Sequence, residues 1–101
     1  MKKYLVDITP DARKEIKRLP GNMRQRVLRA LRDLENNPYP SGSKELNFLL
    51  SESKLHRLRL DRWRIVYAVI EEDELIIVLT VRRRPPYDYS DLGDLSSTID
   101  Y

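Results

Sequence analysis

An alternation of arginine and apolar residues between positions 55 and 67 constrains the fold of this chain more than any other feature. The stretch reads LHRLRLDRWRIVY. Successive side chains of a β-strand point to opposite faces, so the pattern predicts two strands with arginines on one face and apolar residues on the other. The break at Asp61 indicates a tight turn between them. A sheet face that carries so many cations needs an anionic partner.

The sequence before this stretch predicts a helical hairpin. Residues 9–11 read Thr-Pro-Asp, which is typical of a helix start because threonine caps the first turn, proline needs no partner there, and an acid suits the positive helix end. Apolar residues at helical spacing then indicate helices up to residue 19 and over about 23–35. The break between them, Pro-Gly-Asn, is short and favours antiparallel packing.

The remaining elements complete a small α+β fold. Residues 38–44 have the composition of a loop, and residues 45–53 favour neither helix nor strand. Short connections between the later strands indicate an antiparallel meander in the order β-α-α-β-β-β, with the helices on one face and the arginine face left open. The predicted strands cover residues 4–8, 55–60, 62–70 and 75–81, the first of them at a sheet edge.

Length and composition limit the possible classes of protein. The chain has 101 residues, enough for one domain with a modest core, which we predict over residues 1–89 with a polar, flexible tail over 90–101. It has no cysteine, which excludes disulfides, thiolate metal sites and a cysteine nucleophile. We see no signal peptide and no membrane-spanning run, so a cytoplasmic protein is expected.

The charge of the chain is unevenly distributed. Lysines and arginines number 19 against 16 acids, and the net charge of +3 alone barely argues for a nucleic-acid partner. Residues 54–67, however, carry five of these cations and one acid, and residues 82–84 add three more arginines. The acids gather instead at 71–74 and from residue 88 onward. We therefore expect an electrically asymmetric surface.

The arginines at the two ends of this region form the candidate site. Arg57, Arg59 and Arg64 share a predicted face, and Arg82 to Arg84 follow the last strand. Guanidinium groups bind phosphate through two parallel hydrogen bonds and stay charged at any biological pH. Such a cluster could also stabilise the charge that develops during phosphoryl transfer. A solvated strand face is the alternative, but the convergence of several arginines favours phosphate binding.

Two tyrosines and the single histidine adjoin this set. Tyr87 and Tyr89 follow the triple arginine, where they could stack on an unpaired base, transfer a proton, or simply pack the end of the sheet. His56 shares its parity with Leu58 and Leu60, which predicts a semi-buried histidine that faces the helices. No second histidine is present to build a zinc site, and no glycine-rich phosphate loop exists. We expect neither a metal nor another cofactor.

Three motifs together resemble the RelE/ParE toxin superfamily: HRLRL at 56–60, WRIVY at 63–67, and VRRR at 81–84 with a tyrosine soon after. The likeness covers about residues 3–89. It implies a small toxin of a type II toxin–antitoxin pair, held inactive by a cognate antitoxin. RelE-type members enter the ribosomal A site and cut mRNA, whereas ParE-type members poison DNA gyrase. The completeness of the basic set favours the RelE type.

The resemblance also implies roles for individual residues. A RelE-type toxin would be a metal-independent endoribonuclease in which the 2′-hydroxyl of mRNA attacks the adjacent phosphorus. Arginine is a poor proton acceptor, so the base remains unidentified. The implied catalytic residues are Arg57, Arg59, Arg64, Arg84 and Tyr87, and the implied RNA-binding residues are Lys54, Arg62, Arg82, Arg83 and Tyr89.

The partners implied by the resemblance are the antitoxin, the ribosome and mRNA, with operator DNA contacted only through the antitoxin and no membrane. Arginines of the second helix, such as Arg24 and Arg26, belong either to an ordinary helix surface or to a grip on ribosomal RNA. Two other functions stay open. One is a ParE-type gyrase inhibitor, and the other is a non-catalytic module whose basic face docks an acidic partner.

Overall fold

A computed structural model describes residues 3–50 and 53–84 of the chain. Tyr87, Tyr89 and the predicted tail lie outside the described residues. The elements in chain order are β1 (Leu5–Ile8), α1 (Pro10–Lys17), α2 (Gly21–Leu34), β2 (Ser43–Leu50), β3 (Ser53–Leu60), β4 (Trp63–Ile70), the short 3-10 helix η1 (Glu71–Asp73) and β5 (Leu75–Arg83).

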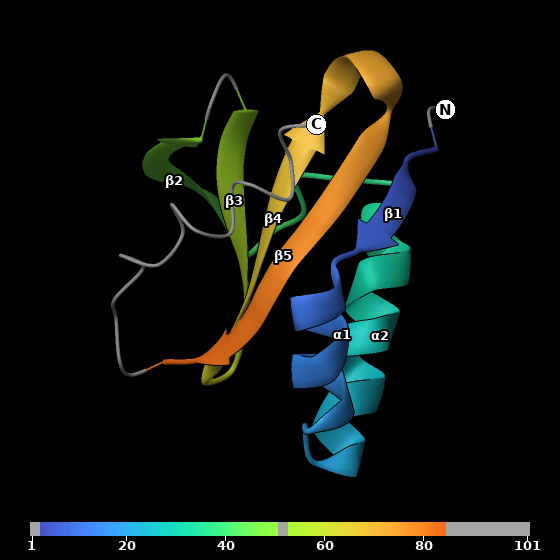
Figure 1. Ribbon diagram of the computed structural model, residues 1–101, viewed down its shortest axis with the longest axis vertical. Helices are drawn as coiled ribbons and strands as arrows, with labels where there is room; N and C mark the ends of the chain where they lie inside the picture. Colours follow the sequence, from blue (N-terminus) through green and yellow to red (C-terminus); the bar gives the residue numbers. More distant parts are fainter. Residues whose placement is uncertain (1–2, 51–52, 85–101) are drawn as a thin grey trace.

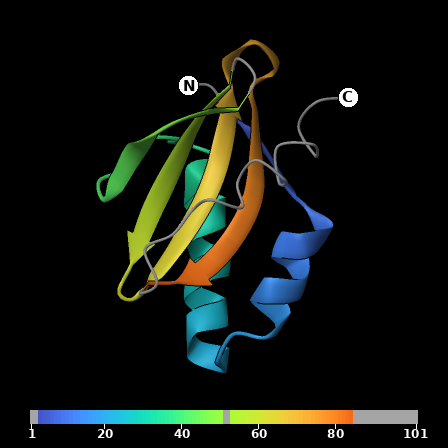
Figure 2. The ribbon, with the colours of Figure 1, turned by 60° about the vertical axis from the view of Figure 1, so that its left-hand side comes forward.

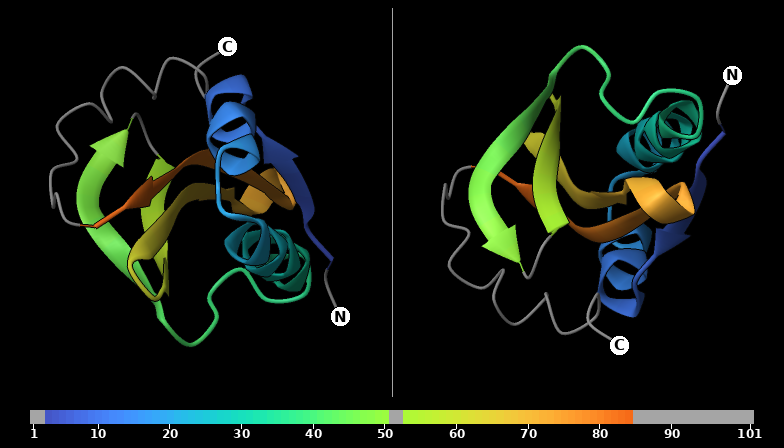
Figure 3. Two further views of the ribbon diagram at one scale, coloured as in Figure 1. Left: turned by 90° about the horizontal axis from the view of Figure 1, so that it is seen from below. Right: turned by 90° about the horizontal axis from the view of Figure 1, so that it is seen from above.

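The strands form one five-stranded sheet in the order β1-β5-β4-β3-β2 (Figure 1). β1 lies parallel to β5 at one edge, and the other neighbouring strands are antiparallel. The predicted α+β fold and the edge position of the first strand are therefore confirmed. Seen along its long axis, the sheet is strongly curved, with the helices near the β1 edge and β2 at the far side (Figure 3).

Strand β2 begins inside the predicted loop, at residues 43–44, and continues through residues 45–50, for which the sequence favoured neither helix nor strand. Its first residues pair with β3, so that Lys44 lies opposite Arg57, and the register then shifts between Glu45 and Leu49. The chain enters β2 through Gly42, whose φ of 93° suits glycine and whose carbonyl accepts a hydrogen bond from the Arg59 amide at 3.2 Å. The meander thus has four strands because pairing with β3, rather than local patterning, defines β2.

The helical hairpin packs on one face of the sheet. Thr9 caps α1 as predicted, since its hydroxyl oxygen accepts from the Ala12 amide at 3.2 Å. α2 lies behind the central strands and α1 beside β5 and β1 (Figure 2). None of the helices in residues 3–50 and 53–84 is long and apolar enough to cross a bilayer. The main core consists of Tyr4, Ala12, Ile16, Leu19, Met23, Val27, Leu31, Leu34, Leu58, Ile65, Tyr67, Val69, Ile76, Val78 and Val81.

The face opposite the helices departs from our expectation of an open, arginine-lined surface. Part of it is a second apolar cluster, in which every buried member is at most 2% exposed. The same period-2 alternation that aligns Arg57 and Arg64 also places Leu55 and Val66 on their face, and β5 adds its own apolar residues. The basic part is confined to the end near the β3–β4 turn. The cluster consists of Leu55, Val66, Ala68, Ile77 and Leu79.

Candidate functional site

Three arginines lie in one row across the sheet. Arg59 of β3 pairs with Arg64 of β4, and Arg64 in turn pairs with Arg82 of β5. Directly opposed residues of antiparallel strands point to the same face with their Cβ atoms about 5 Å apart. We call Arg59, Arg64 and Arg82 the arginine row. Sequence reasoning had placed Arg82 only near the end of the last strand, but the strand register puts it in line with the other two.

Two further cations lie on the same face as the arginine row, on the side toward β2. Arg57 lies two residues before Arg59 on the same face, and Lys44 of β2 is directly opposite Arg57. Arg57 is held by a hydrogen bond from its Nη1 atom to the Gly42 carbonyl at 3.1 Å. Sequence reasoning missed Lys44 because its segment was assigned to a loop, and only the pairing with β3 reveals its face. The basic surface therefore spans four strands.

Backbone acceptors orient Arg64 at the centre of the row. Its Nη1 atom donates to the carbonyl oxygens of Asp61 and Trp63, at 2.8 and 2.9 Å. The first carbonyl belongs to the β3–β4 turn and the second to the first residue of β4, and Asp61 makes the turn possible with a φ of 52°. Aspartate tolerates this left-handed conformation better than most residues. The turn thus fixes the position of a candidate catalytic side chain.

Arg84 joins the same end of the sheet. Its amide donates to the Arg62 carbonyl at 2.6 Å, which extends the β4–β5 pairing to the turn. The tip of β5 accordingly lies beside the β3–β4 turn (Figure 1). A hollow of about 550 Å³ borders this end, and Arg59 and Arg62 are among its lining residues. Arg62 and Arg84 are therefore within the neighbourhood that the sequence predicted for them.

Two arginines of α2 have structural partners. Arg26 forms a salt bridge with Asp61, and the hydrogen bond from this guanidinium holds the pKa of the Asp61 carboxyl below its usual range. Arg24 donates to the carbonyls of Lys17 and Leu19, both at 3.2 Å, and so closes the end of α1. These contacts favour the ordinary helix surface over a dedicated grip on RNA.

Other predicted residues are separated from the row. Lys54 has the opposite parity from Arg57 and forms an ion pair with Glu45 at 3.8 Å. Arg83 lies opposite Trp63 and so alternates away from Arg82. Neither side chain shares the face of the arginine row. Tyr87 and Tyr89 lie outside the described residues.

A carboxylate of α1 supports the strand that carries Arg82. Glu15 accepts hydrogen bonds from the Thr80 hydroxyl at 2.7 Å and from the Val81 amide at 3.1 Å. These residues lie next to the point where the β4–β5 register shifts by one residue. The sequence contains no signal for this contact, because Glu15 resembles any exposed acidic residue of a helix and its partners lie far away in the chain. We interpret Glu15 as a positioning residue for the end of β5.

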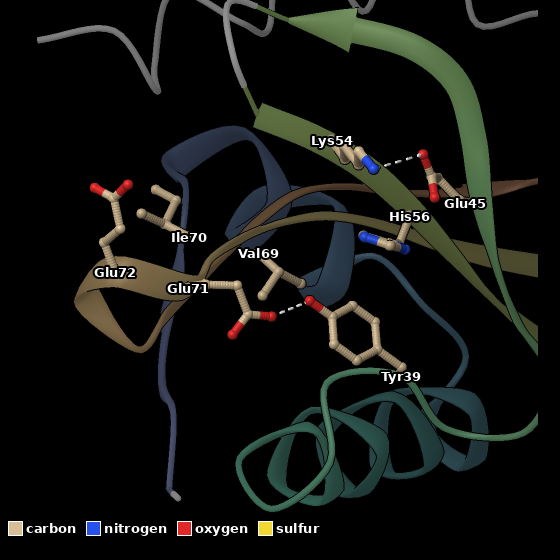
Figure 4. A pocket seen from close by; sticks show the side chains of 8 residues that line it. All are labelled: Tyr39, Glu45, Lys54, His56, Val69, Ile70, Glu71 and Glu72. Atoms are coloured by element: carbon tan, nitrogen blue, oxygen red, sulfur yellow. Dashed lines mark hydrogen bonds and ion pairs between the residues drawn. The ribbon is translucent and has the colours of Figure 1, made fainter.

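A second hollow lies at the other end of the sheet (Figure 4). Its volume is about 600 Å³, and it is bordered by β3, the end of β4 and the loop after α2. His56 is 8% exposed and faces the helices, as predicted. Its ring lies between those of Tyr39 and Tyr67, with centroids at 5.1 and 5.6 Å. Among the described residues, no group of acids and histidine is arranged to hold a metal ion.

Burial of His56 predicts a pH-dependent stability. Burial lowers the pKa of the imidazole in the folded protein, so the unfolded chain takes up a proton first as the pH falls below 6.5. We expect the free energy of unfolding to decrease from about pH 7.5 to about pH 5.5, above the range in which exposed carboxylates titrate. Urea denaturation measures it. In His56→Phe the decrease should vanish, and an unchanged slope would contradict this assignment.

Comparisons with known proteins agree with this geometry. A family model described as the ParE toxin of the type II toxin–antitoxin system parDE matches residues 6–85. RelE1 of Methanocaldococcus jannaschii is 27% identical over 82 residues, which cover 81% of this chain and 91% of that protein.

Solved structures show the same relationship. A chain of the RelE–RelB complex from Pyrococcus horikoshii OT3 superposes with a TM-score of 0.73 and 28% identity, covering 84% of this chain and 98% of that one. A chain of the RelBE2 toxin–antitoxin complex from Mycobacterium tuberculosis gives a TM-score of 0.69 and 26% identity, with 83% and 94% covered. A double mutant of the E. coli toxin RelE in the free state, at 21% identity and a TM-score of 0.69, shares the fold over 98% of this chain and 99% of that chain.

Proposed function

Because the chain belongs to the ParE toxin family of type II toxin–antitoxin systems, within the RelE/ParE superfamily, we propose that it is a ribosome-dependent endoribonuclease that cuts mRNA in the A site. The observation that carries the proposal is the arginine row. Opposed like charges on a sheet repel one another, and a bound polyanion offsets that cost. RNA supplies closely spaced phosphates that suit such a row.

The proposed reaction needs no metal ion. The 2′-oxygen attacks the adjacent phosphorus as its proton passes to solvent, the bond from phosphorus to the 5′-oxygen breaks, and the departing 5′-oxygen takes up a proton, so that no net proton is consumed. The products are a cyclic phosphate and a free 5′-hydroxyl end. Negative charge grows on the phosphoryl oxygens in the transition state of this reaction. Fixed guanidinium groups stabilise that transition state more than they stabilise the ground state.

Each arginine has a role in this scheme. Arg57 and Arg59 hold the scissile phosphate, and Arg64 stabilises the developing charge from the centre of the row. Arg84, tied to the β3–β4 turn, assists the leaving oxygen. Tyr87 stays a prediction for orienting the 2′-hydroxyl or stacking on a base. Arg82 and Lys44 extend the surface on either side and contact the neighbouring phosphates.

A cognate antitoxin is the proposed protein partner. Relatives from archaea and bacteria were crystallised with RelB antitoxins, including those of Pyrococcus horikoshii and Mycobacterium tuberculosis. The basic surface would attract an acidic segment of such a partner as readily as it attracts RNA. Binding there would block access to the arginine row and keep the toxin inactive.

Primer extension on mRNA after controlled expression tests the proposal. Cuts at A-site codons during translation are expected, and they should disappear when translation initiation is blocked. The name of the matching family favours gyrase inhibition as a second candidate, which would induce the DNA damage response and leave mRNA intact. If neither mRNA cuts nor damage signalling were observed, both mRNA cleavage and gyrase inhibition would be overturned. The non-catalytic binding module would then remain.

A further inference from the structure

The hollow beside His56 has the chemistry of a binding pocket and lies far from the arginine row along the strands. His56 and Lys54 come from the start of β3, whereas Arg59 is near its end. On β4, likewise, Val69 lies at the opposite end from Arg64. We call the hollow shown in Figure 4 the His56 pocket. Nothing in the cleavage scheme uses it.

A largely buried imidazole without a hydrogen-bond partner is directed into the pocket. His56 is 92% buried, and its ring nitrogens have no hydrogen-bond partner among the described residues, although its ring stacks on Tyr67 and meets Tyr39 edge-on. Figure 4 shows the ring turned toward the centre of the hollow. Because burial lowers its pKa, the imidazole is neutral at pH 7 and offers one acceptor and one donor nitrogen. A buried polar group of this kind is normally satisfied by a ligand or partner atom.

The pocket has a negative balance. Three carboxylates line it, and the ammonium group of Lys54, already paired with Glu45, is the one formal cation in the lining, so the formal sum is −2. Glu71 accepts hydrogen bonds from the Tyr4 and Tyr39 hydroxyls, which keeps its carboxylate in place. Burial and this hydrogen bond raise the pKa of Tyr39, so the phenol remains the donor. The third carboxylate, Glu72, is exposed at the rim.

The other walls suit a long amphipathic side chain. Val69 provides an apolar surface beside the Tyr39 ring, and Ile70, which packs on the other face of the sheet, closes the outer edge of the hollow. The loop that carries Tyr39 is held by a 2.7 Å hydrogen bond from the Tyr67 hydroxyl to the Pro38 carbonyl. Arginine side chains pack their methylene stem on apolar surface, stack their planar head on aromatic rings and donate to carboxylates at the same time.

We propose that the His56 pocket receives the guanidinium group of an arginine from the antitoxin, with one N–H donated to the His56 ring and others to the Glu71 carboxylate, while Glu72 at the rim adds to the negative field. The proposal rests on the toxin–antitoxin assignment and not on the cleavage reaction. Charge complementarity selects the antitoxin as the occupant. Because the two ends of the sheet attract opposite charges, a partner with an acidic and a basic segment is bound in one direction only.

A small guanidinium compound tests the chemistry of the pocket. We expect N-acetyl-arginine methylamide to shift the NMR backbone signals of Tyr39, His56 and Ile70 saturably, at millimolar concentrations. N-acetyl-citrulline methylamide has nearly the same shape without the charge and should leave these signals unchanged. Equal shifts with both compounds, or no saturable shift with the arginine derivative, would overturn the proposal.

Matched variants of the acidic turn test the antitoxin as occupant. Glu72→Gln removes a pocket carboxylate, whereas Asp73→Asn removes the neighbouring charge, which does not line the pocket. Calorimetry with the antitoxin at low salt should give about a threefold loss of affinity for Glu72→Gln and none for Asp73→Asn, since Glu72 is exposed and screened. His56→Phe should cost about tenfold, because the arginine then loses its acceptor.

The outcomes separate this proposal from its competitors. Equal losses in the two acidic-turn variants would indicate a diffuse field and overturn it. If the arginine derivative bound but the pocket variants kept the parental affinity for the antitoxin, the pocket would be a site for small guanidinium compounds. An arginine of the antitoxin would then be excluded as its occupant. A change in self-association of the toxin alone would assign the pocket to a second copy. Glu72→Gln should still cut mRNA like the parent protein, so failure of the cleavage assay would not affect these results.

Discussion

Replacement of Arg64 by alanine is expected to lower the rate of mRNA cleavage by about 100-fold or more, the usual effect of removing one group that stabilises transition-state charge. Arg64 is the middle member of the arginine row, with Arg59 and Arg82 opposite it on the two neighbouring strands. In the proposed mechanism its loss removes the central cation of the row. Single-turnover cleavage on programmed ribosomes measures the effect.

The control variants separate this chemistry from folding. Arg18→Ala removes an exposed cation at the end of α1 and should leave cleavage unchanged. Arg64→Lys keeps a charge but loses the planar fork, and an intermediate rate is expected. Arg64→Ala should still bind the antitoxin, with an affinity lowered by no more than the loss of one charge from the row, and melt within a few degrees of the parent protein. Cleavage at the parental rate in that variant would remove Arg64 from the mechanism.

Truncation of Leu34 is expected to have the largest effect on stability. Leu34 ends α2 with its side chain fully buried in the main core. Leu34→Ala should reduce the free energy of unfolding by about 2–5 kcal/mol, because it loses buried apolar surface and leaves a cavity. A domain of this size is stable by only about 5–15 kcal/mol, so this is a large share. Urea denaturation measures this loss of unfolding free energy, and the m-value should be unchanged.

The same substitution elsewhere on α2 provides the control. Leu28 is 37% exposed, and Leu28→Ala should cost less than about 1 kcal/mol, as expected away from the core. Antitoxin in excess should raise the midpoint of Leu34→Ala, because a ligand of the folded state stabilises it by mass action. Equal losses for the two leucines would mean that the core does not sit where the structure places it.

Local patterns were sufficient for much of the fold. The Thr9 cap, the helical hairpin, the turn at Asp61 and the faces of β3 and β4 depend on residues close in sequence, and all were predicted and then found. The helix limits moved by about two residues, since helix ends depend on tertiary contacts such as those of Arg24. The inward orientation of His56 followed from strand parity alone.

Long-range pairing decided the rest. The sequence by itself determined that arginines alternate with apolar residues and therefore share a face, because parity is a property of one strand. Only the tertiary structure aligned Arg82 with Arg64, brought Lys44 opposite Arg57 and placed Glu15 under Thr80. It also packed apolar side chains together on part of the expected basic face and formed the His56 pocket. The physical reason is that these alignments depend on the register between strands. That register is set by the shift in β5 and by the pairing of β2, which both involve residues far apart in the chain.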